Sequence, residues 1–169
     1  MKKKGYYEYD PVIYPRMLCV AIGMNQEDAN KCFEGRNGGV LRVDFSNADA
    51  ITYGNVREKS NKKLCSFINF ASKNSMRMGV CCHEASHACD TIEGAIGMEH
   101  GGEPSAYLIG WIASCINKAR LEILLRLRMM KLISKEEVKK NHKDILGLDL
   151  LFAENFPPYS RFLEKCLNT

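Results

Sequence analysis

The sequence predicts an α+β fold in which an antiparallel or mixed β-sheet precedes a helical half. Short segments with strand-like composition fill residues 1–74, and the spacing of apolar residues becomes helical from Ser75 onward. Hydrophobic residues make up 46% of the chain, which is enough to build a buried core. A length of 169 residues predicts a single domain, 1–169, with a β-rich part (1–74) and a helical part (75–169).

Four segments of the first part are predicted to be strands. Each is rich in apolar or β-branched residues and is bounded by turn residues or charged loops. They are residues 16–22, 40–45, 50–56 (interrupted by Gly54) and 64–70. A short helix at residues 25–33, with Asn25 as its N-cap, separates the first two. We expect three to five strands, the last two being sheet core rather than an edge that binds peptide.

The second part is predicted to be helical. One helix spans residues 76–96, with Ser75 as its N-cap and Gly97 at its end. A glycine-rich loop then leads to a second helix, which begins at Glu103 or Pro104 and continues to about residue 133. A capping-box pattern and further apolar spacing predict shorter helices beyond it, starting at residues 134–137 and covering 145–155 and 160–167.

Composition excludes several classes of protein. The basic start has no apolar run behind it, and no stretch approaches 18 uninterrupted apolar residues, so we expect a cytoplasmic protein without a membrane partner. The eight cysteines form no Cys-x-x-Cys pair, and several lie in apolar runs. They are therefore interpreted as buried reduced thiols rather than as disulfides or a zinc ribbon.

One short motif carries the chemistry of the sequence, His83-Glu84-Ala85-Ser86-His87. Histidines four residues apart on a helix project from one face, so both imidazoles can bind one zinc ion. Glu84 is rotated about 100° from His83, which places its carboxylate beside the open coordination position. Zinc lowers the pKa of a bound water to about 7, and this carboxylate can take the proton. The motif predicts His83 and His87 as ligands and Glu84 as the base.

A zinc site of this kind needs a third protein ligand, for which the sequence offers three candidates. Glu93 lies six residues after His87, the spacing of metzincins, but no helix breaker separates the two. His100 lies in the glycine-rich loop. Glu103 opens the second helix and is the preferred candidate, because small residues at positions 106, 110 and 113 would let the two helices approach closely. An acid that simply meets the helix dipole is the alternative for Glu103.

The motif and the segment Glu103-Pro-Ser-Ala-Tyr107-Leu-Ile-Gly-Trp111 together resemble the gluzincins. These are zinc peptidases whose third ligand is a glutamate on a downstream helix. Small phage- or prophage-type metallopeptidases with a Glu-x-x-Ala-Tyr-x-x-Gly-Trp signature are more similar still, over about residues 64–116. The resemblance implies a zincin-like fold with the zinc site in the helical half. It also implies His83, His87 and Glu103 as ligands and Glu84 as the catalytic base.

Three further residues are candidates for supporting roles. Asp90 lies one turn beyond His87 and could orient a ligand imidazole, although an ordinary helix aspartate is an equal alternative. His100 or Tyr107 could donate a hydrogen bond to the oxyanion that forms during peptide hydrolysis. No motif supports either assignment, so both are hypotheses.

The sequence therefore predicts a zinc-dependent metalloendopeptidase that hydrolyses a peptide or protein substrate by Glu84-assisted attack of zinc-bound water. A non-catalytic zinc-binding interaction module is the first alternative, although a structural site has no use for Glu84. A small basic nucleic-acid-associated protein is the second, because basic residues outnumber acids across 118–143. That segment lacks interleaved aromatic residues and is interpreted as a solvated helix face, so no nucleic-acid partner is expected.

Overall fold

The computed structural model describes residues 2–3 and 5–129 and confirms an α+β architecture in which a mixed sheet precedes long helices. The contacts of the chain divide it into two units, Met1–Leu121 and Glu122–Thr169, and the sheet lies in the first. The helices predicted beyond residue 130, and Cys166, lie outside the described residues. No helix in the described part is long and apolar enough to cross a membrane.

The described part of the chain contains a sheet of five strands with a sixth, two-residue strand at one edge. The strand order is β1-β2-β3-β6-β5-β4, with β3 and β6 parallel and every other pair antiparallel. The bounds are β1 Lys2–Lys3, β2 Tyr6–Tyr9, β3 Met17–Ile22, β4 Phe33–Gly35, β5 Ala50–Glu58 and β6 Leu64–Phe70. The structure thus adds β1, β2 and β4 to the predicted strands, and it extends the predicted strand at 50–56 to Glu58.

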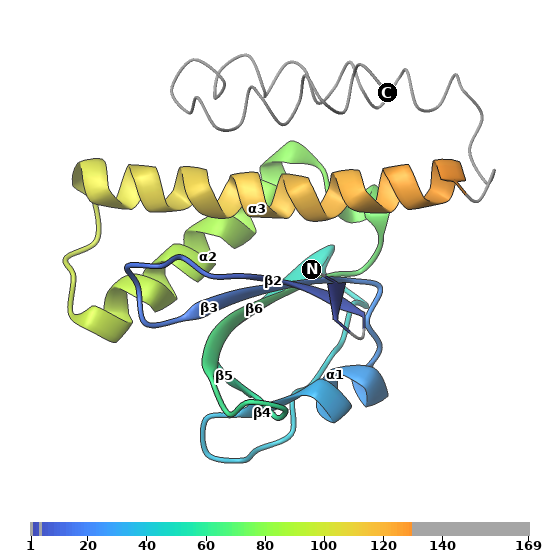
Figure 1. Cartoon of the computed structure of the whole chain (residues 1–169), viewed down its shortest axis with the longest axis horizontal. Helices are drawn as coiled ribbons and strands as arrows, with labels where there is room; N and C mark the ends of the chain where they lie inside the picture. Colours follow the sequence, from blue (N-terminus) through green and yellow to red (C-terminus); the bar gives the residue numbers. More distant parts are fainter. Residues whose placement is uncertain (1, 4, 130–169) are drawn as a thin grey trace. The chain divides into compact units, whose positions relative to one another are not determined.

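Both faces of the sheet are covered. Helix α1 (Gln26–Cys32) lies on one side, whereas α2 (Met78–Ile96) and the start of α3 (Gly102–Met129) lie on the other (Figure 1). On the α1 side Phe33 stacks on Phe67 with ring centroids 4.2 Å apart, in a cluster that includes Tyr6. Consecutive side chains of a strand point to opposite faces of the sheet. All four residues from Leu18 to Ala21 are fully buried, so β3 is covered on both faces.

Helix α1 begins where its cap was predicted. The side chain of Asn25 accepts a hydrogen bond of 2.8 Å from the backbone N–H of Asp28, which pairs one of the N–H groups left free at a helix start. The helix ends at Cys32, where the chain turns into β4. The prediction of a helix over 25–33 is therefore confirmed.

The predicted strand at residues 40–45 is wrong, because this segment bonds to side chains of α1 instead of to a strand. Asn30 accepts from the N–H of Leu41 at 2.7 Å and donates to its carbonyl at 2.9 Å. Gln26 accepts from the N–H of Val43 at 2.7 Å. The two amide side chains form hydrogen bonds with backbone groups that a neighbouring strand would otherwise pair. The alternating pattern of this segment therefore does not produce a strand.

The bounds of α2 follow the prediction at one end only. Ser75 was predicted to cap it, but Ser75 ends a separate 3-10 turn, Lys73–Ser75, which is capped by Ser72. Helix α2 begins after Arg77, whose side chain makes no capping hydrogen bond. At the other end Gly97 adopts φ 67°, the left-handed conformation that terminates a helix readily when the residue is glycine.

Four of the seven described cysteines pack as small buried residues, whereas Cys32 and Cys81 are half-buried and Cys82 is exposed. The seven within the described chain are free, and Cys19, Cys65, Cys89 and Cys115 are buried. Burial raises the pKa of Cys89 and of Cys115 to about 12, so both thiols stay protonated at neutral pH. The prediction of reduced, packed thiols is confirmed for these residues.

Candidate functional site

The histidines of the motif lie side by side on α2. His83 and His87 are one turn apart and exposed, and their Nε2 atoms are 3.1 Å apart. Their rings meet edge to face with centroids 4.5 Å apart. A single helical turn is enough to create this arrangement, because residues i and i+4 share a face. The predicted pair is therefore brought together.

Glu84 faces the sheet rather than solvent. Only 5% of its surface is exposed, and its Oε2 accepts a hydrogen bond of 2.6 Å from the hydroxyl of Thr52 on β5. A buried carboxylate is costly unless it is paired, and this hydroxyl supplies one partner. The rotation of about 100° along the helix thus places Glu84 between α2 and β5 while both histidines stay open.

A close approach between α2 and β5 makes this contact possible. A Cβ atom added at Gly54 would lie 2.5 Å from Oγ1 of Thr91 on α2. That hydroxyl donates to the carbonyl of His87 at 3.0 Å, so the same threonine contacts both the strand and the motif. A glycine inside a strand often marks a close approach of this kind, and the Gly54 interruption is the one sequence signal that pointed to it.

A cleft of about 560 Å³ lies between the helix and the strand. It is lined by the three motif residues and by Asp90 and Thr91 of α2, together with residues from the start of β5 and the loop before it: Ala48, Ala50, Ile51, Thr52, Gly54. The motif thus opens onto a recess of the size that ligand sites occupy.

Among the described residues, one side of β5 has no strand partner along this cleft. Residues Ala50–Tyr53 pair with β6, whereas β4 meets β5 only from Val56 to Glu58. The register shifts between Tyr53 and Val56, so the strand is irregular where the pairing with β4 begins. We predicted sheet core for both strands. This is right for β6, which lies between β3 and β5, but the first half of β5 is an edge of the sheet that the described residues form.

Glu103 is exposed in the first turn of α3, and the described residues do not group it with the two histidines. The predicted approach of α3 through positions 106, 110 and 113 is wrong in register, because Ala106 is exposed. The buried stripe of α3 is Ser105, Leu108, Ile112, Cys115, Ile116 and Ala119. Its large apolar side chains bury more area than the small residues would. Glu103 as the third ligand stays a prediction.

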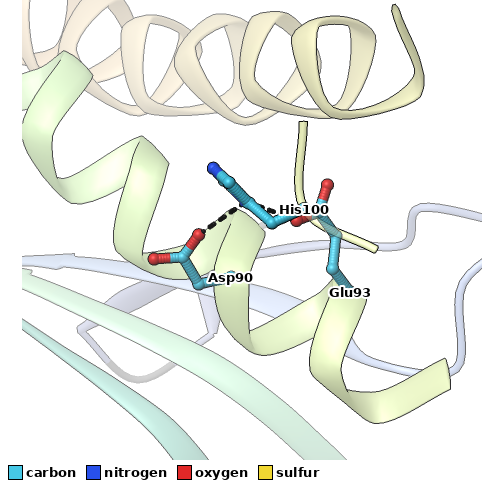
Figure 2. Close-up of side chains that lie close together, drawn as sticks. All are labelled: Asp90, Glu93 and His100. Atoms are coloured by element: carbon cyan, nitrogen blue, oxygen red, sulfur yellow. Dashed lines mark hydrogen bonds and ion pairs between the residues drawn. The ribbon is translucent and has the colours of Figure 1, made fainter. Parts of the chain in front are cut away.

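The two other candidates for the third ligand lie in a different group. Nδ1 of His100 is 2.7 Å from Oε2 of Glu93 and 3.0 Å from Oδ1 of Asp90 (Figure 2). The hydrogen bond with Glu93, helped by the charge of Asp90, holds the pKa of His100 above its ordinary value. Tyr107, the other oxyanion candidate, is 63% exposed on α3. The supporting roles of Asp90, His100 and Tyr107 also stay predictions.

Comparisons of the chain with protein-family models, with curated proteins and with solved structures found no match. The function is therefore argued from the residues themselves. Sequence reasoning found the motif, but it did not find Thr52. The contact of Thr52 with Glu84 depends on how β5 packs against α2.

Proposed function

We propose that the protein is a zinc-dependent peptidase whose site is built on His83, Glu84 and His87. The distance between the two histidines is the observation that carries this proposal. Two nitrogen ligands bound at about 2.05 Å to one tetrahedral zinc ion lie about 3.3 Å apart. The Nε2 atoms of His83 and His87 are 3.1 Å apart, so the pair suits one ion without rearrangement.

The donor set also suits zinc chemically. Imidazole nitrogen is a favoured zinc ligand, and a carboxylate commonly completes a catalytic set of three. We propose Glu103 as that carboxylate, which makes the set two histidines and one glutamate. A zinc ion held there would polarise the scissile carbonyl and make a water molecule acidic at neutral pH.

Glu84 serves as the proton carrier in this proposal. Thr52 occupies its Oε2, which leaves Oε1 to accept a proton from the attacking water. The water oxygen forms a bond to the carbonyl carbon. Glu84 then returns the proton to the leaving amine nitrogen as the peptide bond breaks. Because the carboxylate is 5% exposed and held by Thr52, it is oriented before substrate arrives.

The open edge of β5 supports a peptide as the substrate. Residues Ala50–Tyr53 pair with β6 on one side and with no described strand on the other, where an extended peptide can add as a further strand. The same residues border the cleft that contains the motif. A peptide bound there would run past His83 and Glu84, with its backbone held by hydrogen bonds that do not depend on sequence.

The test is a comparison of the wild type with Glu84→Gln in metal content and in hydrolysis of an unstructured peptide library. We expect Glu84→Gln to keep its zinc and to lose at least about 100-fold in hydrolysis rate. Glu99→Gln is the matched control, because Glu99 is an exposed glutamate in the loop before α3 and does not line the cleft. A wild type fully loaded with zinc that cleaves no peptide, or an active Glu84→Gln, would contradict the proposal.

A further inference from the structure

A second group of metal-ligating side chains lies at the C-terminal end of α2. Asp90 and Glu93 project from the helix, and His100 reaches them from the loop that leads to α3 (Figure 2). One ligand atom from each lies within 4.8 Å of the others, and this is the one group of three such residues that the described part of the chain contains. Neither His83 nor His87 belongs to it.

Glu93 distinguishes this group from an ordinary surface cluster. Asp90 and His100 are about half exposed, but only 2% of the Glu93 side chain is accessible. Its Oε2 meets His100, whereas its buried Oε1 has no hydrogen-bond partner among the described residues. Desolvation of such an oxygen costs about 1–3 kcal/mol unless something else satisfies it.

Two donors close to the Glu93 side chain bond to backbone carbonyls. The hydroxyl of Ser105 donates to the carbonyl of Gly101 at 2.9 Å. The thiol of Cys89 points to the carbonyl of Ser105 at 3.8 Å. The Glu93 side chain is therefore buried with one oxygen against His100 and the other without a hydrogen-bond partner among the described residues.

We propose that Asp90, Glu93 and His100 form a second divalent metal site, separate from the His83–His87 pair. Neighbouring ligand atoms of an ion with bonds of about 2.1 Å lie about 3.0 Å apart in octahedral geometry and slightly further apart in tetrahedral geometry. The distances of 2.7 and 3.0 Å from His100 Nδ1 are close to this. Glu93 Oε1 supplies a further ligand atom in a bidentate contact.

The donor set indicates the class of ion. One imidazole nitrogen with two carboxylates suits a first-row transition ion such as Zn²⁺ or Mn²⁺, whereas Ca²⁺ takes oxygen ligands alone. The bound ion joins α2 to the loop before α3. Without the ion, the contacts of His100 with Asp90 and Glu93 link the two.

The test uses the full chain with the first site removed. In a His83→Ala, His87→Ala background we would titrate Zn²⁺ and, separately, Ca²⁺ by calorimetry after treatment with a chelator. His100→Gln is then added, because glutamine keeps a donor for Glu93 but is a poor zinc ligand. Glu99→Gln in the same loop is the matched control. His100 is exposed, so its substitution should not prevent folding, which circular dichroism checks.

We expect one Zn²⁺ per chain in the double variant and in its Glu99→Gln derivative. The His100→Gln derivative should bind at least about tenfold more weakly, and Ca²⁺ should bind weakly throughout. The imidazole signal of His100 should shift in NMR spectra when Zn²⁺ is added. Equal zinc affinity with and without His100→Gln would overturn the proposal, as would an unmoved His100 signal. Because the first site is absent, these results do not depend on whether the protein is a peptidase.

Discussion

The hydroxyl of Thr52 donates a hydrogen bond of 2.6 Å to Oε2 of Glu84, which joins the open edge strand β5 to the motif helix α2. The two residues are 32 positions apart in sequence. In the proposed mechanism this contact leaves Oε1 of Glu84 to accept the proton. It also makes the geometry of the cleft depend on the packing of a strand rather than on the helix alone.

The contact predicts a dual effect of Thr52→Val, which removes the hydroxyl while keeping the shape of the side chain. We expect the free energy of unfolding to fall by about 1–3 kcal/mol, because a buried carboxylate oxygen loses its donor. Hydrolysis should fall about tenfold or more as Glu84 loses its orientation, with zinc content unchanged. Urea unfolding, peptide cleavage and metal analysis measure the three quantities. Thr52→Ser keeps the hydroxyl and should remain near wild type; if both variants behave alike, the hydroxyl is not the cause.

Glu103→Ala tests the third zinc ligand. In a His100→Gln background, which removes the second proposed site, we expect zinc affinity to fall at least about tenfold. Calorimetry with Zn²⁺ measures it, and Glu99→Gln serves as the control for loss of a nearby exposed charge. Stability should change by at most about 1 kcal/mol, the usual size of a helix-dipole effect. Equal zinc affinity in Glu103→Ala and the control would remove Glu103 from the site.

Gly54→Ala tests the close approach between β5 and α2. The added methyl would lie 2.5 Å from Thr91 Oγ1, so the Thr91 side chain must rotate or α2 and β5 must move apart. We expect a loss of about 1–3 kcal/mol in the free energy of unfolding, as is usual for overpacking. Thr91→Ala combined with Gly54→Ala should recover part of this loss, because it removes the atoms that clash. Urea unfolding of the wild type, the two single variants and the double variant gives the coupling free energy between Gly54 and Thr91. Strictly additive losses would show that the two residues do not meet.

His100 predicts a pH dependence of stability in the metal-free protein. Its folded-state pKa is raised, first by the hydrogen bond with Glu93. Its stabilising contribution is therefore fully present below the unfolded-state pKa of about 6.5, and it is lost as the pH rises through the folded-state value. The wild type should thus be more stable than His100→Gln at pH 6, and the difference should shrink toward pH 8. Urea midpoints measured with a chelator present check this; a difference that grows with pH would contradict it.

Local patterns predicted those parts of the fold that local forces determine. The strand at residues 64–70 was placed correctly because it is a short apolar run, and its residues are buried on both faces of the sheet. Asn25 was recognised as a cap because its side chain bonds to a neighbour three residues away. Residues 40–45 carry an equally good strand pattern, but the amides of Gln26 and Asn30 satisfy that backbone instead. A competition of this kind depends on the tertiary fold and leaves no local signal.

The same division holds for the candidate site. His83, Glu84 and His87 were found because one helical turn brings them together and their chemistry is specific. Thr52 was missed, since its contact with Glu84 depends on how β5 packs under α2. The face of α3 was also mispredicted, because its apolar stripe takes precedence over its small residues. The motif residues were therefore predictable from the sequence, whereas the residues that contact them depend on tertiary packing.

The parallel pairing of β3 with β6 has a consequence for how the chain folds. Met17 pairs with Cys65 and Ile22 with Phe70, so the centre of the sheet joins residues about 50 positions apart. During synthesis β2 and β3 can form a hairpin early, but that hairpin must wait for β6 to emerge from the ribosome. Until then an apolar strand, Met17–Ile22, exposes an unpaired edge in the nascent chain. We expect slow folding from this high contact order, and a period of vulnerability to aggregation that ends when Leu64–Phe70 docks.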